Sequence, residues 1–381
     1  METVRKAYKY KLKPTPAQER QLEEVLWRCR TLYNTALEQR ITLYRQRGVF
    51  RSQYEQEAEL KDLRAAMPEY AAIHSHVLQD VLARLEKTYQ AFFRRVKAGQ
   101  TPGFPRFHGQ ERYNSFTYKE FGNGARLDGI LDNGFIVLSK IGRMVVRWSR
   151  PLEGTPKSVT ISREADGWYV CISCADVPTQ PLEPTGQETG IDLGLESFAT
   201  LADGTMIHNP RCYRKAERRL KTAQRKVARR KKGSNRRCKA VKLLAKAHQK
   251  VRRQRQDFQH KSALQLVRNY DVIYHEDLQA ANMLKNHHLA KSIADAGWSQ
   301  FLSILNHKAA CAGRSVVAVN PAYTSQTCSG CGAVVKKELS VRWHACPDCG
   351  TSLHRDHNEA KNIERLGQSR QGGVALAASE N

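Results

Sequence analysis

The chain has 381 residues, enough for about two to three domains, and 40% of them are hydrophobic, which excludes general disorder. The 63 lysines and arginines against 37 acidic residues give a net charge of +26, which predicts a polyanionic partner rather than charge kept only for solubility. No stretch approaches the ~18–20 apolar residues of a membrane span. Since the N-terminus also lacks an apolar signal segment, we expect a cytoplasmic protein with reduced cysteines.

The first 100 residues predict a strand followed by helices. Basic and apolar residues alternate over 4–13, as in a half-exposed strand. Thr15 and Gln18 form a capping box, and apolar residues then recur at helical spacing as far as Gly48. A second amphipathic helix is expected over about 75–98, so this part of the chain predicts a helical domain entered from one strand.

Residues 101–185 have a β pattern. Short runs of β-branched and aromatic residues alternate with Gly and Asn turns, which predicts a barrel-like set of strands. Cys171 and Cys174 form a C-x-x-C pattern inside one such run. Residues three apart on a strand point to opposite faces, so we expect no metal there.

The next segment, residues 211–255, contains 21 lysines and arginines and one acid, Glu217. The pattern predicts two basic helices joined by a turn near Gly233. A merely solvated surface is the alternative, but such one-sided charge repels itself without a counter-charge, which favours nucleic acid as the partner. The candidate contacts, here and in the preceding domains, are Arg94, Arg95, Arg106, Arg218, Arg229, Arg230, Lys231, Arg236 and Arg237.

Four cysteines near the C-terminus form two matched pairs, Cys328 with Cys331 and Cys346 with Cys349. Two C-x-x-C knuckles separated by 14 residues match a tetrahedral four-thiolate zinc site. Four thiolates leave no open position for water, so the predicted Zn²⁺ is structural and not catalytic.

Three acids lie in positions suited to a different metal. Asp192 lies in a short strand flanked by glycines, Glu276 ends an apolar strand, and Asp356 opens the last helix. Each has a plainer interpretation. Asp192 could be a turn residue, Glu276 a surface acid with Asp277 as the alternative ligand, and Asp356 an acid at a helix N-terminus. Hydrolysis of a phosphodiester by two Mg²⁺ ions needs carboxylates that converge from separate elements. Their order along the chain is typical of an RNase H-like nuclease core.

Together the motifs resemble TnpB, the RNA-guided nuclease family of insertion-sequence transposons, which is related to type V CRISPR effectors. The matching segments run through nearly the whole chain: Tyr8 to Leu12 with Pro14, Thr15 and Gln18; Tyr33 and Asn34; Phe92 to Arg95; Gly103 to Phe107; Gly190 to Gly194; His275 to Leu278; Thr324 to Cys328 with the cysteine pairs; Arg355 to Ala360; and Asn362 with Ile363. One departure is His354, which stands where the family often has an acid.

The resemblance implies a multidomain α/β plus β-barrel protein with a RuvC-type, RNase H-like core, in which Asp192, Glu276 and Asp356 bind two Mg²⁺ ions. The implied parts are a wedge-domain first strand (1–14), a helical recognition domain (15–100), a wedge β-barrel (101–185), a nuclease core (186–320) with a basic hairpin (211–260), a zinc ribbon (321–350), a final helix (351–366) and a disordered tail (367–381).

It also implies a monomeric ribonucleoprotein. A guide RNA from the transposon end would pair with double-stranded target DNA, while the protein reads a short adjacent motif and cuts by Mg²⁺-dependent hydrolysis. The alternatives are a nuclease-inactive RNA-guided repressor, an unguided zinc-ribbon DNA-binding protein and a DDE-type transposase. The complete set of three acids disfavours the first, and the zinc insertion before the last acid disfavours the third.

Overall fold

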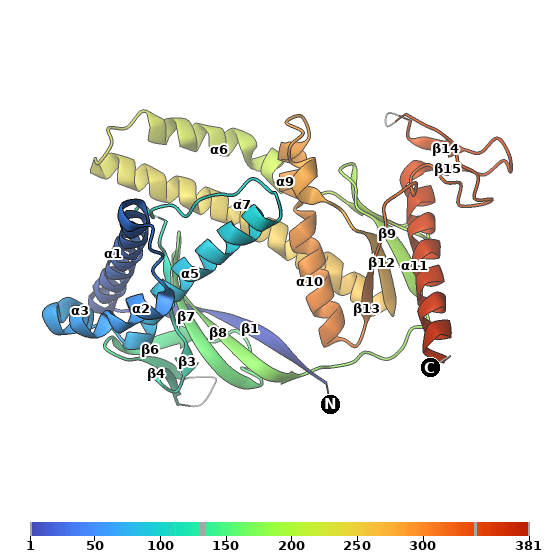
Figure 1. Cartoon of the computed structure of the whole chain (residues 1–381). Coiled ribbons are helices and arrows are strands. Elements are labelled where there is room, and N and C mark those ends of the chain that lie inside the picture. The colour runs from blue at the N-terminus through green and yellow to red at the C-terminus, as the bar shows by residue number, and fades with distance from the viewer. Residues whose placement is uncertain (1, 111, 130–133, 339–340, 380–381) are drawn as a thin grey trace. The chain divides into compact units, whose positions relative to one another are not determined.

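The computed structural model describes residues 2–110, 112–129, 134–338 and 341–379, with side chains to residue 369. The chain divides into two compact units, Met1–Pro178 and Thr179–Asn381. None of the helices in the described ranges is long and apolar enough to cross a membrane. Each unit has its own sheet and its own core (Figure 1).

The first unit is built on an eight-stranded sheet with the order β2-β7-β8-β1-β6-β5-β4-β3. β3, at one end of this order, also contacts β7, so the sheet curls on itself. Tyr8, Tyr10 and Leu12 alternate into its core, as the pattern of β1 predicts. The strands are β1 (Thr3–Lys13), β2 (Ser115–Tyr118), β3 (Glu120–Phe121), β4 (Gly124–Asp128), β5 (Phe135–Leu138), β6 (Gly142–Arg147), β7 (Thr155–Glu164) and β8 (Gly167–Pro178).

Five helices accompany this sheet: α1 (Pro16–Arg47), α2 (Gln53–Ala58), α3 (Leu60–Ala66), α4 (Pro68–Ala71) and α5 (Ser75–Lys97). The capping box at Thr15 and Gln18 is confirmed, and Gly48 ends α1 with a φ of 63°. That left-handed conformation costs glycine little, which explains why the helix ends there. α1 packs against α5, whose buried face begins at Val77.

The second unit contains a five-stranded sheet with the order β11-β10-β9-β12-β13. β9 (Glu188–Asp192), β12 (Val272–Glu276) and β13 (Ser315–Val319) pair in parallel, whereas β10 (Ser197–Leu201) pairs antiparallel with both β9 and β11 (Met206–His208). Ile191 pairs with His275, so Asp192 and Glu276 end neighbouring strands at the same edge of the sheet.

Helices cover both faces of this sheet. Ile273 packs with the cluster that includes residues of α7 (Asn235–Asn269) and α10 (Trp298–Cys311), while its neighbour Tyr274 packs with Ile363 of α11 (Arg355–Ser379) on the opposite face. Figure 1 shows α11 and α10 on either side of the strands. The remaining elements are α6 (Cys212–Ala228), α8 (Ala280–Met283), α9 (Ala290–Ala296), β14 (Trp343–Ala345) and β15 (Ser352–His354).

The last helix differs from its expected bounds. It begins at Arg355, after β15, and continues through residues 367–379, where a disordered tail was expected. The expected bounds end the helix at residue 366, but Gly367 lies inside it, where a Cβ would stand 1.9 Å from the ring of Tyr274. Glycine is therefore used here for close packing against β12 and not as a helix stop.

Candidate metal centres

Four buried carboxylates gather where β9, β12 and α11 meet. Oxygens of Asp192, Glu276 and Glu359 all lie within 4.8 Å of one another. Asp356 opens α11 beside them, and a Cβ placed on Gly194, just after β9, would stand 4.0 Å from its Oδ2 atom. All four side chains are at most 9% exposed. The three acids chosen from the sequence are thus brought to one end of the sheet.

Glu359 is the residue that sequence reasoning missed. It lies three residues after Asp356 on the same helix, a spacing that places two side chains on one face. That spacing was the only indication of Glu359 in the sequence. It points to the metal centre only once α11 is known to pack this face against the sheet. The Glu359 carboxyl also forms a hydrogen bond with Glu276.

His354, which stands where the family often has an acid, lies at the start of α11. Its Nδ1 atom accepts a hydrogen bond from the backbone N–H of Asp356 at 3.3 Å and lies 3.9 Å from Asp356 Oδ2. One of the N–H groups of the first helical turn, which have no partner within the helix, is thereby satisfied. The imidazole therefore serves as a helix cap beside the last acid.

Burial and mutual repulsion shift the titration of this cluster. Burial raises the pKa of Asp192 well above its usual value, and the charges of Glu359, Asp356 and Glu276 raise it further. Burial also raises the pKa of Glu276, against a hydrogen bond from Thr324 that lowers it. The pKa of Glu359 is raised to about 8, chiefly by burial and then by Glu276, with Arg355 opposing. Carboxylates held this close repel one another when ionised, and a cation bound among them would offset that repulsion.

The donor set fits a hard divalent cation. Carboxylate oxygens on separate rigid elements are the ligands that Mg²⁺ takes in proteins, usually together with phosphate oxygens and water. Arg355 Nε lies 3.6 Å from Asp356 Oδ1, and Arg355 also opposes the raised pKa values of Asp192 and Glu359, so this cation offsets part of the charge of four carboxylates. Asp192, Glu276 and Asp356, with Glu359 beside them, can therefore hold such an ion.

The four predicted zinc ligands also converge. Their sulfur atoms lie within 4.8 Å of one another, and the Cys328–Cys349 and Cys331–Cys346 Sγ distances are both 3.6 Å. Ligands about 2.3 Å from a tetrahedral Zn²⁺ stand roughly 3.8 Å apart, whereas a disulfide would need about 2.05 Å. The geometry fits a four-thiolate site. Figure 1 shows the adjoining β14 and β15 beside the beginning of α11.

Local hydrogen bonds favour the thiolate at Cys349 and Cys328, whereas the pKa of Cys331 is raised to about 12, because the lowering by the backbone of Ala333 is outweighed by hydrogen bonds with the neighbouring thiols and by burial. Contacts with the side chain and backbone of Thr351 lower the pKa of Cys349 to about 6. Burial raises the pKa of Cys328, but the backbone N–H groups of Cys331 and Gly330 contribute to lowering it to about 7. Deprotonated sulfur is the form that binds zinc.

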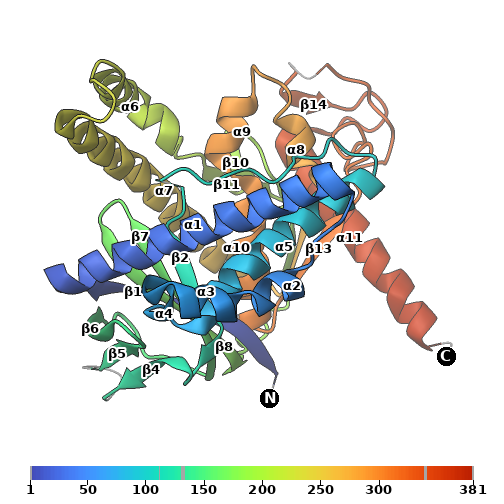
Figure 2. The ribbon, with the colours of Figure 1, turned by 60° about the vertical axis from the view of Figure 1, so that its left-hand side comes forward.

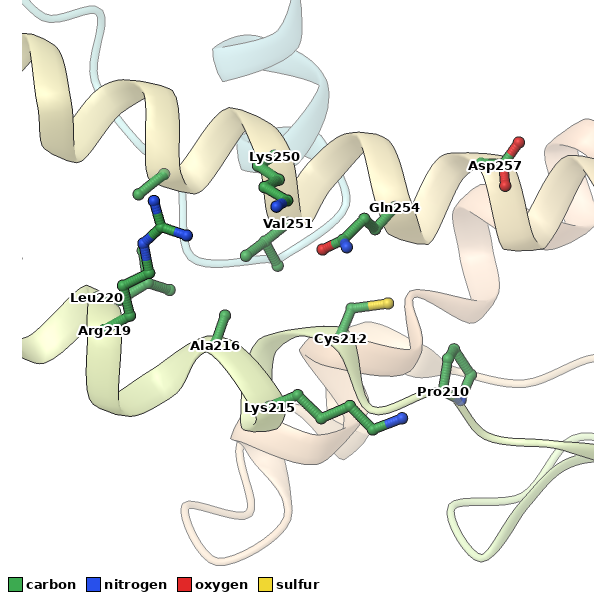
Figure 3. A pocket seen from close by; sticks show the side chains of 11 residues that line it. Pro210, Cys212, Lys215, Ala216, Arg219, Leu220, Lys250, Val251, Gln254 and Asp257 are labelled. Carbon is green, nitrogen blue, oxygen red and sulfur yellow. The ribbon is translucent and has the colours of Figure 1, made fainter.

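The basic segment forms a helical hairpin, as predicted. α6 and α7 lie side by side, visible in both Figure 1 and Figure 2, and a groove of about 490 Å³ separates part of their length. Figure 3 shows Cys212 and Arg219 of α6 and Lys250, Val251 and Gln254 of α7 turned toward this groove. An open, cationic groove suits a phosphate backbone better than a small apolar ligand.

The basic residues chosen from the sequence differ in their availability. Arg237 donates hydrogen bonds to the carbonyl oxygens of Val227 at 2.7 Å and Arg230 at 3.2 Å, so it holds the hairpin turn together. The chosen residues with exposed side chains are Arg94, Arg95 and Arg106 in the first unit and Arg218, Arg229, Lys231 and Arg236 in the second.

Three family models match the chain: OrfB_IS605, described as "Probable transposase", over residues 169–287; the TNB domain of Cas12f1-like proteins over 298–363; and a helix-turn-helix domain over 1–49. The described part of this last range, residues 2–49, contains β1 and the long helix α1 and no second helix. The TNB match contains all four cysteines and the part of α11 from Arg355 to Ile363.

Two relatives match nearly end to end. A "Putative RNA-guided DNA endonuclease" from Streptomyces pristinaespiralis is 35% identical, covering 96% of this chain and 90% of that protein. The "Putative RNA-guided DNA endonuclease InsQ" of Escherichia coli K12 is 30% identical over 95% and 92%. A "TnpB-like protein L79" of Acanthamoeba polyphaga mimivirus is 28% identical and covers 58% of this chain and 45% of its own length.

Two solved structures share the fold. The protein of a Cas12f1–sgRNA–target DNA complex superposes with a TM-score of 0.61 at 12% identity, covering 95% of this chain and 99% of that one. The mini-RNA-guided endonuclease CRISPR-Cas_phi3 superposes with a TM-score of 0.54 at 10% identity, over 96% and 92%.

Proposed function

This chain belongs to the TnpB family of transposon-encoded RNA-guided DNA endonucleases, and from that premise we propose that it cuts double-stranded DNA at a site chosen by a bound guide RNA. The observation that carries the proposal is the gathering of Asp192, Glu276 and Asp356 at one end of the second unit's sheet. A protein that only bound DNA would have no need to bury several carboxylates together, since unpaired buried charge is costly.

The three acids are proposed to hold two Mg²⁺ ions. When bound, Mg²⁺ supplies Lewis-acid activation of the scissile phosphate and of the attacking water. The residues do the positioning: Asp192 and Glu276 are fixed at adjacent strand ends, and Asp356 is fixed by the first turn of α11. Burial excludes bulk water from the carboxylates and strengthens their attraction for the bound cations.

The division of the chain into working parts is likewise a proposal. The curled sheet of β1 to β8 is the wedge domain (1–14 and 101–185), and the helices inserted in it form the recognition domain (15–100). Residues 186–320 and α11 form the RuvC-type core, interrupted by the zinc ribbon (321–350). The superposition with a Cas12f1 complex supports this order of parts.

The nucleic-acid partners follow from charge and from the family. The exposed cations of α6, α7 and the first unit contact phosphates of the guide RNA and of its duplex with target DNA, without reading sequence. Base pairing selects the target, and the protein reads a short adjacent motif. The functional particle is proposed to be a monomer of this chain with one guide RNA.

The decisive test replaces Asp192 with alanine in the protein purified with its guide RNA. Cleavage of a matched plasmid should be lost while the amount of co-purified RNA stays unchanged, because Asp192 contacts metal and not RNA. Asp277→Ala is the matched control, since this neighbouring acid is exposed and should be dispensable. Retained cleavage by Asp192→Ala would overturn the assignment. If Asp277→Ala lost cleavage while Glu276→Ala kept full activity, Asp277 and not Glu276 would be the second metal ligand.

A further inference from the structure

The segment between β13 and the first zinc knuckle reaches into the carboxylate centre. Thr324, only 2% exposed, donates a hydrogen bond from Oγ1 to Glu276 Oε1 at 2.5 Å. The carbonyl oxygen of Pro321 lies 3.0 Å from the same hydroxyl. A hydroxyl has one proton to give, and the shorter partner is the carboxylate, where a charge-assisted bond is the stronger one. Glu276 therefore has its orientation fixed by a side chain from outside its own strand.

Two buried asparagines on α11 hold the rest of this segment. Asn362 Nδ2 donates to the carbonyl oxygens of Thr324 at 2.9 Å and Thr327 at 2.7 Å. Asn358 Nδ2 donates to Thr327 O at 2.7 Å, and its Oδ1 accepts from the backbone N–H of Ser329 at 2.9 Å. Asn358 and Asn362 are 0% and 2% exposed, and one helical turn separates them.

These bonds form a continuous connection between the two metal centres. Ser329 lies inside the knuckle between Cys328 and Cys331, whose sulfurs belong to the zinc site. The backbone from Thr324 to Ser329 is thus tied to the zinc ligands at one end and to Glu276 at the other. α11, which supplies the two asparagines, also carries Asp356.

We propose that Thr324 is a positioning residue for Glu276 and that this segment, braced by Asn358 and Asn362, makes the divalent-cation affinity of the carboxylate centre depend on the zinc centre. The inference rests on the proposed function in that Glu276 holds the cation. Partners that orient a metal ligand typically change metal affinity by about 10–100-fold when they are removed. A zinc ribbon that served only to contact nucleic acid would have no such effect.

The test measures Mn²⁺ binding to the full-length protein without RNA, by titration calorimetry, because RNA itself binds divalent ions. Thr324→Val keeps the shape and removes the hydroxyl, and Thr324→Ser keeps the hydroxyl. We expect Thr324→Val to weaken Mn²⁺ binding by roughly tenfold or more, with one zinc per chain retained by mass spectrometry. Thr324→Ser should bind Mn²⁺ like the unaltered protein.

Zinc removal with a chelator, followed by dialysis, tests the connection itself. In the unaltered protein, zinc removal should weaken Mn²⁺ binding. In Thr324→Val, zinc removal should weaken Mn²⁺ binding little further, since both changes break the same connection between Glu276 and the zinc ligands. Equal additional losses in the two proteins would overturn the coupling, and unchanged Mn²⁺ affinity in Thr324→Val would overturn the role of Thr324.

A second readout uses the protein with guide RNA and matched DNA. Thr324→Val should need a higher Mg²⁺ concentration for half-maximal cleavage and should recover most of the rate at saturating Mg²⁺. Damage to the fold alone would lower the rate at every concentration. Asp192→Ala separates the two levels of inference: if it binds Mn²⁺ as tightly as the unaltered protein, the proposed metal site fails, whereas if it loses Mn²⁺ while Thr324→Val does not, only the positioning role fails.

Discussion

At the scale of single residues, the carboxylate centre is an arrangement of buried like charges that the fold holds together with only partial neutralisation by cations. Asp192, Glu276 and Glu359 are buried within one small volume, and the nearby Arg355 offsets only part of their charge. Burial raises the pKa of all three acids, and the repulsion of neighbouring carboxylates raises those of Asp192 and Glu359 further. Such a site is most stable when the acids are protonated or when a cation is bound.

This gives a pH prediction for the metal-free protein. The folded-state pKa values of these acids lie above their unfolded values of about 4, with that of Glu359 at about 8. Between those values the folded state binds more protons than the unfolded state, so their stabilising contribution is present at low pH and is lost as pH rises toward about 8. Chemical denaturation at several pH values measures this.

The substitution Glu359→Gln isolates the contribution of this carboxyl group to the pH dependence of stability. The variant should lose stability less steeply between pH 5 and pH 8 than the unaltered chain, and saturating Mg²⁺ should flatten the slope of the unaltered chain as well. Glu196→Gln, on an exposed acid, is the control and should leave the slope as it is. An identical slope in Glu359→Gln would contradict the raised pKa.

At the scale of elements, the site depends on how closely α11 approaches the sheet. A Cβ on Gly190 would lie 2.2 Å from the carbonyl oxygen of Ala360 and 2.6 Å from the backbone nitrogen of Glu364. At Gly367 a Cβ would meet the ring of Tyr274. Backbone atoms, and a ring as fully buried as that of Tyr274, cannot move aside as a flexible exposed side chain can. Glycine at these two positions therefore lets the helix bring Asp356 and Glu359 to the strand ends.

Gly190→Ala should therefore displace α11. We expect a loss of about 1–3 kcal/mol of stability, the usual cost of overpacking, and weaker Mn²⁺ binding, measured by urea denaturation and calorimetry. Gly109→Ala is the control, because a Cβ there meets nothing within 4 Å and the backbone is not left-handed. Unchanged stability and metal affinity in Gly190→Ala would show that α11 can accommodate a Cβ at residue 190 without being displaced.

At the scale of the whole molecule, the net charge of +26 is concentrated enough to act as a binding surface. The hairpin of α6 and α7 carries many cations with few acids to neutralise them. Lys221 and Lys261 are exceptions, since their ammonium groups lie 3.0 Å from Glu217 and 2.8 Å from Asp257. Arg229 and Arg236 form no ion pair within the described ranges, so their charge is available to phosphates.

Guide-RNA affinity should therefore fall steeply with salt, and Arg229→Ala with Arg236→Ala should lower the slope of log K against log salt. Each lost contact removes about 0.7 from the slope on single strands and about 0.9 on duplexes. Lys221→Ala with Lys261→Ala removes the same formal charge from paired positions and should change the slope less. Filter binding across a salt series measures both, and equal changes in the two variants would contradict a specific role for the unpaired arginines.

The features that could be predicted from the sequence are those set by neighbours along the chain. A capping box, a left-handed glycine at a helix end, two cysteine knuckles and a run of cations each carry their own chemistry within a few residues. The order of Asp192, Glu276 and Asp356, two after strands and one on the final helix, is typical of an RNase H-like nuclease core, and the structure brings these residues to one end of the sheet. The location of the centre could thus be predicted before its geometry was known.

What only the tertiary structure decided arises where segments distant in sequence touch. Gly367 has the same local signal as Gly48, yet the first lies within a helix packed on Tyr274 and the second ends one. Arg237 is one more cation in the sequence, but its hydrogen bonds assign it to the turn. Glu359 and Thr324 join the carboxylate centre because α11 and the segment before the knuckle fold back onto β9 and β12. Local pattern fixes conformation along the chain, whereas burial, close approach and hydrogen-bond partners across the chain are properties of the packed molecule.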